Sequence, residues 1–175
     1  MNGIYNNKSG NKSWQVMFDE IPTSLDMIRA LPLANLLEPH YAAALLIPAL
    51  CLWTTNQDEA INIMNFLKGP QPLSIREIQF INERLRGKDY LPFSYFESSS
   101  PENGYTPLKP YTVTISTVPT SFSEEGYLKL YLKSSGADSS RPLQLRRKDS
   151  SGEWFLWDQM LLSDIRQPIS TDPWS

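Results

Sequence analysis

The sequence predicts an α+β fold in which N-terminal helices pack on one face of a C-terminal antiparallel sheet of about four strands. Two observations lead to this prediction. In the first half of the chain apolar residues recur at helical spacing, whereas from Tyr111 onward they alternate with polar residues, as in half-buried strands. Helices that precede strands in this way are typical of a domain whose helices cover the apolar face of the sheet.

Composition divides the 175 residues into three parts. Residues 1–13 are mostly Asn, Gly, Lys and Ser, and we expect them to form a flexible segment. Residues 14–169 are expected to form a single α+β domain, and residues 170–175 a C-terminal tail. The N-terminal residues contain no apolar stretch, and the single cysteine, Cys51, cannot form an internal disulfide. We therefore expect a cytoplasmic protein without a signal peptide.

The segment from Glu38 to Trp53 holds almost no polar side chain, so the rest of the chain must be organised around it. Ala, Leu and Ile on every side predict a helix that is buried all round. Its roughly 14 residues are too few for the ~20 that cross a membrane. Pro48 removes one helical hydrogen bond, so we expect a kink, or two short helices that meet at Ile47–Pro48.

Other elements are predicted on either side of this segment. Alternation over Trp14–Phe18 indicates a weak strand, and Thr23 or Ser24 should cap a short helix after it. An amphipathic helix should begin in the capping cluster 54–59 and end at Gly69–Pro70. A second one should start with the capping box formed by Ser74 and Glu77, whose side chains can each bind the backbone amide of the other residue.

Residues 89–109 carry aromatic residues among Pro, Ser and Gly without any regular period. We expect a long ordered loop, which is either a lid on the core or a recognition surface. Phe93 and Phe96 are expected to be buried, whereas Tyr95 and Tyr105 should keep their hydroxyls toward water.

The four strands are predicted from the alternation of Leu, Val, Ile and aromatic residues with polar ones. They lie around residues 111–116, 127–133, 143–146 and 154–157. The turn 149–152 should join the last two strands as a hairpin, so the strands should form an antiparallel meander.

Two resemblances to known families add to this interpretation. The strand order and the hairpin at 146–154 (RRKDSSGEW) resemble the cone-shaped nuclear-transport-factor-2-like fold, which implies a pocket between sheet and helices. From Glu38 onward the chain is similar to an uncharacterised family of small proteins from gut Clostridia. This similarity is carried by the segments 66–70 (FLKGP), 86–90 (RGKDY), 101–107 (PENGYTP), 134–138 (SSGAD), 154–157 (WFLW) and 172–174 (DPW). It implies no particular activity.

No set of residues in the sequence predicts catalysis or metal binding. His40 and Cys51 are eleven positions apart on the central helix, which places them about 16 Å apart along its axis, too far for a catalytic dyad. One His and one buried Cys cannot supply a zinc site, and there is no Gly-rich phosphate loop. Catalytic residues, metal and cofactor are therefore not expected.

The sequence favours a non-catalytic interaction or accessory domain, with an unknown protein or small molecule as its partner. The residues expected to bind that partner are Tyr90, Tyr95, Tyr105, Tyr127, Tyr131, Lys129 and Arg146. Tyrosines among lysines on one strand face can stack nucleic-acid bases, but more often such a face solubilises the sheet. Because the net charge is −3, we expect neither nucleic acid nor a membrane as the partner.

The alternative hypothesis is a small-molecule-binding or hydrolytic protein of the cone-shaped type. Its pocket would lie between the sheet and the helices. The lining would come from Trp154, Trp157 and Tyr111, with Asp158 inside.

Overall fold

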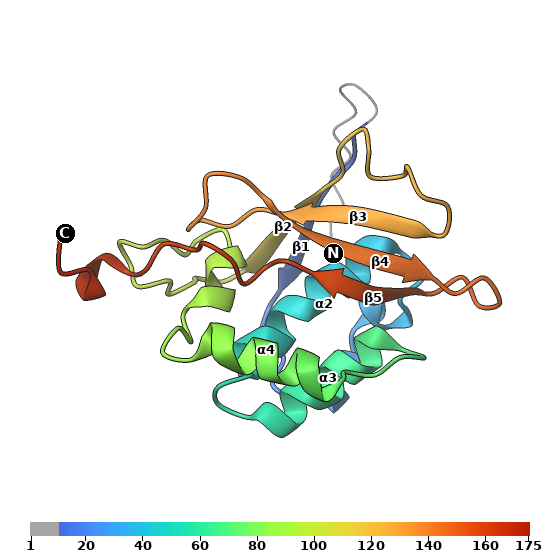
Figure 1. Cartoon of the computed structure of the whole chain (residues 1–175), viewed down its shortest axis with the longest axis horizontal. Helices are drawn as coiled ribbons and strands as arrows, with labels where there is room; N and C mark the ends of the chain where they lie inside the picture. The colour runs from blue at the N-terminus through green and yellow to red at the C-terminus, as the bar shows by residue number, and fades with distance from the viewer. Residues whose placement is uncertain (1–10) are drawn as a thin grey trace.

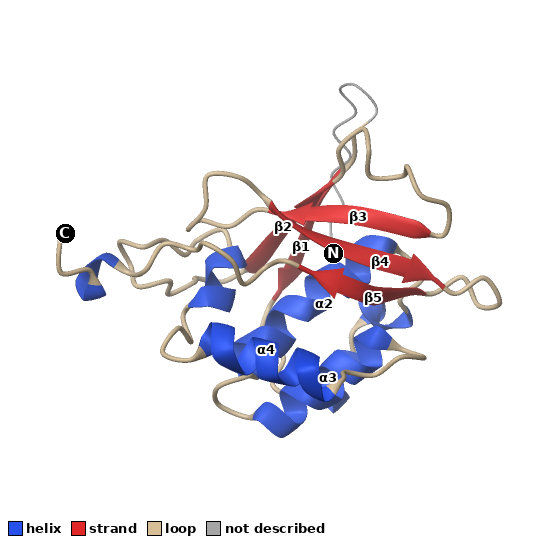
Figure 2. Ribbon diagram, in the orientation of Figure 1, coloured by secondary structure: helices blue, strands red, loops and turns tan. Residues whose placement is uncertain are grey.

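The computed structural model describes residues 11–175, which form an open five-stranded antiparallel sheet with α2, α3 and α4 on one side of it (Figures 1 and 2). The strands are β1 (Ser13–Phe18), β2 (Tyr111–Ser116), β3 (Tyr127–Leu132), β4 (Arg141–Arg147) and β5 (Trp154–Gln159), paired in that order. The α-helices are α1 (Leu25–Arg29), α2 (Pro39–Leu52), α3 (Gln57–Lys68) and α4 (Ile75–Leu85). Short 3-10 helices span Pro32–Asn35, Leu91–Tyr95 and Ile169–Thr171. The predicted α+β class is confirmed, with five strands in place of about four.

The additional strand is β1, the weak strand signal near the N-terminus. It pairs antiparallel with β2 along its whole length, so that Trp14 lies opposite Ile115 and Val16 opposite Val113. Trp14, Val16 and Phe18 are buried, as their alternation predicts. The alternation identifies a strand but not its partner, which lies about a hundred residues away in the sequence. Most of the predicted flexible segment, residues 1–10, lies outside the described residues.

The inner face of the sheet is formed by the alternating apolar positions of its strands. They are Val113, Ile115, Leu128, Leu130, Leu132, Leu143, Leu145 and Leu156, all buried. The predicted period of two is thus confirmed for β2, β3 and β4.

Helix α2 lies between this face of the sheet and the other helices, and it is buried all round, as predicted. From Ala42 to Ala49 each of its residues has 0% exposure, apart from Pro48, which is also buried. The helix contacts α3, the 3-10 segment Leu91–Tyr95 and strands β2 to β5, so it has a neighbour on every side. Pro48 lies inside a single helix, and the alternative of two short helices is therefore wrong. None of the helices in residues 11–175 has the length and apolar character that crossing a membrane requires.

The predicted caps are present at the helix starts. The side chain of Ser24 accepts a hydrogen bond at the start of α1, and that of Asn56, within the predicted cluster, does so at the start of α3. At α4 the capping box is complete. The Glu77 amide donates to Ser74 Oγ at 3.2 Å, and the Ser74 amide donates to Glu77 Oε2 at 2.7 Å.

This capping box predicts non-additive stability effects. Ser74→Ala should lower the free energy of unfolding by about 1 kcal/mol. Glu77→Ala should cost more, because Glu77 also accepts a hydrogen bond from the mostly buried Lys68 ammonium at 2.6 Å. The double variant should cost less than the sum of the two single changes, since each side chain supports the other. Urea denaturation of all four proteins measures this, and strict additivity would show that the two caps act independently.

Candidate partner-binding groove

Three of the predicted binding residues belong to the aromatic loop 89–109, and the structure corrects the expectation for two of them. Tyr95 and Tyr105 are buried, with exposures of 1% and 2%. The Tyr95 hydroxyl donates to the Leu161 carbonyl, and the Tyr105 hydroxyl to the Arg166 carbonyl. The expectation that both hydroxyls face water is therefore wrong, because the segment after β5 passes over the loop and supplies their acceptors.

The remaining rings of the loop complete a lid on the core. Phe96 is fully buried, as predicted, but Phe93 is only partly buried. Tyr90 stacks on Tyr105 with ring centroids 5.4 Å apart and is also partly buried. Burial raises the pKa of Tyr105 to about 12, so its hydroxyl stays protonated as a donor. The loop therefore offers little free aromatic surface to a partner.

The other predicted binding residues lie on the outer face of the sheet. Lys129 is exposed on β3, between the half-buried Tyr127 and Tyr131. Register places Tyr127 directly opposite Arg146 of β4, and the guanidinium carbon lies 5.4 Å from the centre of the Tyr127 ring. Lys129 and Tyr131 instead lie opposite Gln144 and Pro142. Of this set, the structure brings only Tyr127 and Arg146 into direct contact.

Trp157 of β5 completes this contact, although sequence reasoning had assigned it only to the alternative pocket. The Arg146 guanidinium lies 4.8 Å from the centre of the Trp157 ring, and the Tyr127 and Trp157 rings meet edge to face at 5.6 Å. A register shift opposite Gln144 and Leu145 leaves Trp157 without a partner residue on β4. Such a bulge interrupts strict alternation, and both Trp157 and Asp158 remain exposed.

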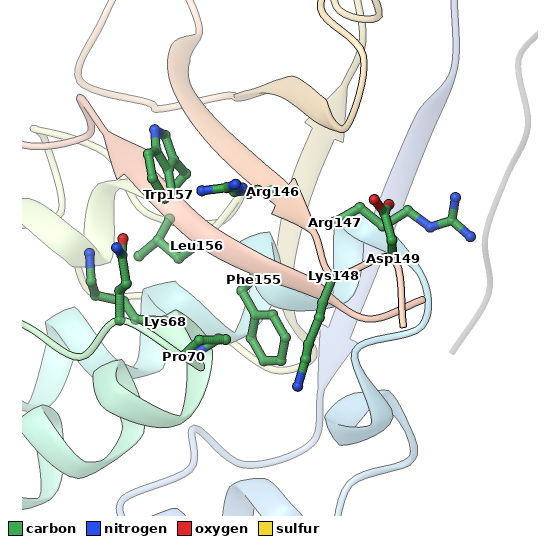
Figure 3. A pocket seen from close by; sticks show the side chains of 10 residues that line it. Lys68, Pro70, Arg146, Arg147, Lys148, Asp149, Phe155, Leu156 and Trp157 are labelled. Atoms are coloured by element: carbon green, nitrogen blue, oxygen red, sulfur yellow. The ribbon is translucent and has the colours of Figure 1, made fainter. Parts of the chain in front are cut away.

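Two adjoining hollows follow β5, one of the two edge strands of the sheet, where it passes α3 and α4. The first, of about 340 Å³, lies between the end of α3 and the β4–β5 hairpin, and Figure 3 shows its lining. The second, of about 400 Å³, lies between α3, α4 and the end of β5. Both are lined by Lys68, Leu156 and Trp157, so they adjoin along β5, and we call the two together the β5 groove.

The two halves of the β5 groove differ in chemistry. Arg146, Arg147 and Lys148 line the first hollow together with Asp149, so its net charge is positive. The second hollow is mainly apolar; its apolar side chains are those of Met64, Leu73, Phe80, Ile81, Leu156, Trp157 and Met160. The β5 groove is therefore positively charged at one end and apolar at the other.

Lys68 forms the wall between the halves but adds no free charge. Its ammonium lies 2.6 Å from Glu77 Oε1, and the side chain is mostly buried. Burial by itself would raise the pKa of Glu77, but the hydrogen bonds from Lys68 and Ser74 outweigh it, so the pKa of Glu77 is lowered. Because Glu77 stays ionised and neutralises Lys68, this lysine presents its alkyl chain to the groove.

Gly69 sets the distance between α3 and the hairpin. It adopts φ +62°, and a Cβ at this position would lie 2.4 Å from the Phe155 ring. Only glycine fits both the positive φ and this close approach. The sequence identified Gly69 as a helix end, but the contact with Phe155 depends on the tertiary fold.

Among the described residues, Arg146, Arg147 and Lys148 form no ion pair, and neither does Arg76, which lines the second hollow. Within residues 11–175 the ion pairs are Lys68–Glu77, Lys109–Glu20 and Arg166–Asp138. The three cations are exposed at the hairpin. In a chain of net charge −3, these three adjacent cations beside the exposed Trp157 concentrate positive charge at one place.

The residues considered for chemistry lie elsewhere. His40 and Cys51 are buried in α2, and burial raises the pKa of the Cys51 thiol, which therefore stays protonated and unreactive. His40 stacks on Trp14, with ring centroids 4.7 Å apart. In the part of the chain that the structure describes, no three His, Cys, Asp or Glu side chains are grouped as a metal site.

The alternative pocket is not assembled as predicted. Trp157 and Asp158 line the β5 groove, but Trp154 and Tyr111 line neither of its hollows. Tyr111 belongs to β2, three strands away from β5 in the sheet, and α2 packs against the inner face between them. The apolar surface that would have lined a pocket there is instead filled by this helix.

The sequence matches one known family profile. The family described as Domain of unknown function (DUF6935) matches residues 20–169, which is most of the chain. No curated protein and no solved structure matches the chain. The likeness to an uncharacterised family is thus confirmed, whereas the likeness to the cone-shaped fold stays a prediction.

Proposed function

The chain belongs to the family Domain of unknown function (DUF6935), and from its geometry we propose that it is a non-catalytic interaction domain that binds a partner protein in the β5 groove. One observation carries this proposal. Along an edge strand, three cations that form no ion pair within residues 11–175 and an exposed Trp157 line a hollow that adjoins a second, mainly apolar one. Trp and Arg are the residues that most often anchor protein interfaces.

The shape of the groove favours a protein partner over a small molecule. Pockets for small molecules usually bury most of their ligand. Here the lining includes exposed side chains, among them Trp157 and Met160, whose exposures are 37% and 59%. A partner in this groove would stay partly solvated, as at the rim of a protein interface. The buried, unpaired Cys51 supports placing this interaction in the reducing environment of the cytoplasm.

Selection from a random peptide library displayed on phage tests the proposal. The wild-type protein should enrich peptides that the double variant Arg147→Gln, Lys148→Gln binds at least about tenfold more weakly. Lys88→Gln, Lys133→Gln is the matched control, because it removes the same charge from exposed positions outside the groove. All four changed residues are exposed, so the melting temperature should stay the same. Selected peptides that bind both double variants equally well would place the binding site elsewhere, and failure to enrich any peptide would count against an interaction domain.

A further inference from the structure

We infer that the occupant of the β5 groove is an extended peptide segment of a partner protein, with acidic residues at one end and apolar residues at the other. This inference rests on the proposed function and adds the chemistry of the partner. It is carried by the different lining of the two hollows and by their arrangement along one strand.

The cationic end selects acidic residues. Arg146 lies against the rings of Tyr127 and Trp157, which hold its guanidinium group in place before any partner binds. Within residues 11–175 the guanidinium groups that donate hydrogen bonds are those of Arg141 and Arg166, so the donors of Arg146 are free for a carboxylate. Arg147 and Lys148 follow directly in the sequence and line the same hollow. Three adjacent cations match a short run of Asp or Glu.

The apolar end selects large hydrophobic side chains. Phe80 and Met160, with exposures of 40% and 59%, lie over a hollow whose deeper lining includes the buried Met64 and Ile81. Methionine side chains adapt their shape to what they contact, and this makes such a hollow suited to Leu, Met or Phe from a partner. A partner side chain buried in this hollow would also shield Phe80 and Met160 from water.

The direction of β5 implies an extended occupant. Because both hollows include Leu156 and Trp157, one segment that runs along the strand reaches both of them. An extended chain advances about 3.3 Å per residue, so the acidic and apolar residues should be only a few positions apart.

A nucleic acid suits this groove less well than a peptide. Its phosphates would find the cations, and its bases could stack on Trp157. However, Glu77 and Asp158 line the apolar half together with Arg76, its single cation without an ion pair among the described residues, and Asp149 lies at the cationic end. A polyanion that followed the groove would meet these carboxylates, whereas an apolar peptide side chain placed there carries no charge.

Titration of the full chain with labelled synthetic peptides, followed by fluorescence anisotropy, tests the inference. The probe carries three consecutive acidic residues, a two-residue Gly-Ser spacer, and Leu followed by Phe. One control peptide has the acids replaced by Gln and Asn, and another has Leu and Phe replaced by Ser. Each control should bind at least about tenfold more weakly than the probe. Higher salt should weaken binding of the probe more than binding of the Gln/Asn peptide.

Charge reversal in the protein gives the decisive comparison. Arg147→Glu, Lys148→Glu should abolish binding of the acidic probe and gain binding of a peptide with Lys at the three acidic positions. Met160→Ser should weaken binding of the probe. It should not change binding of the control peptide in which Leu and Phe are replaced by Ser. Lys88→Glu, Lys133→Glu is the matched control and should leave the Kd of the probe within about twofold, because neither residue lines the cationic or the apolar hollow.

Four outcomes would overturn the inference. The first is that phage-selected peptides bind in the groove while the probe does not; the proposed function would then stand without this partner chemistry. If neither kind of peptide binds, both fail. The third is a twelve-residue oligothymidine that competes at the groove more tightly than the probe. The fourth is self-association, measured by sedimentation, that the groove variants abolish, because the occupant would then be a second copy of this chain.

Discussion

Replacing Leu46 by Ala should lower the free energy of unfolding by about 2 to 5 kcal/mol. Leu46 has 0% exposure near the middle of α2, which the sheet, α3 and the segment Leu91–Tyr95 enclose. The change removes three carbon atoms from a closely packed interior, and the rigid neighbours close the resulting cavity only in part. Leu50, with 1% exposure, should give an effect of similar size. Urea denaturation monitored by tryptophan fluorescence provides the measurement.

A matched control separates burial from the loss of a leucine as such. Leu37 has 53% exposure just before α2, so Leu37→Ala should change stability by no more than about 0.5 kcal/mol. An alanine or glycine scan over residues 42–52 should show no tolerant face. If one side of the helix proved insensitive, α2 would be an ordinary amphipathic helix, and the central position that the structure gives it would be incorrect.

The parts of the fold that the sequence predicts well are those determined by local chemistry. The burial of α2 follows from an apolar segment without a polar stripe, and the cap at Ser74 follows from the spacing of Ser and Glu. The strand positions follow from alternation, in which neighbouring side chains point to opposite faces. In each case the interacting groups lie within a few residues of one another, so their spacing in the sequence determines how they are placed relative to one another.

The aromatic loop shows why other features could not be predicted. Whether Tyr95 and Tyr105 face water depends on the carbonyl groups of Leu161 and Arg166, more than sixty residues later. The sequence shows that tyrosines are present but not that the segment after β5 crosses above them. A tyrosine hydroxyl can be buried or exposed, so the residue type does not decide between the two. Only the tertiary fold distinguishes them.

The β5 groove was missed for a related reason. The contact of Arg146 with Tyr127 follows from strand register, but the approach of Trp157 depends on the register shift opposite Gln144 and Leu145. The pairing of Lys68 with Glu77 further depends on the turn between α3 and α4. One signal was available in the sequence: Arg146, Arg147 and Lys148 are three consecutive cations at a hairpin, with an aromatic cluster on the returning strand. Only the structure shows that these residues and the end of α3 line the same hollow.

The second large effect is a loss of stability at acidic pH. Burial lowers the pKa of His40 to about 4, whereas a histidine in an unfolded chain has a pKa of about 6.5. His40 stacks on Trp14, Tyr41 lies at its edge, and its Nδ1 atom has no hydrogen-bond partner among the described residues. The described residues therefore offer no acceptor for a proton on this atom, and the neutral ring is the form that the fold stabilises.

The sign of the effect follows from which state binds the proton. Above about pH 6.5 His40 is neutral in both states, and its full contribution to stability is present. Between about pH 6.5 and pH 4 the unfolded chain binds a proton that the folded chain excludes, so stability falls as the pH falls. Below about pH 4 both states are protonated, and this group causes no further loss. The loss between pH 7 and pH 5 should be about 2 kcal/mol.

Urea denaturation of the wild type and of His40→Phe at pH 7, 6 and 5 tests this prediction. Phenylalanine keeps a flat ring against Trp14 but has no proton to bind, so the variant should lose little stability over this range. The titration of Glu77 does not affect the comparison of the wild type with His40→Phe. Its pKa is lowered in the folded protein, so its contribution is present above the ordinary pKa of glutamate, about 4.3, and is lost only as the pH falls below that value. Equal pH dependence in the wild type and in His40→Phe would mean that another group excludes the proton, and that the stacked imidazole is not the source of the acid sensitivity.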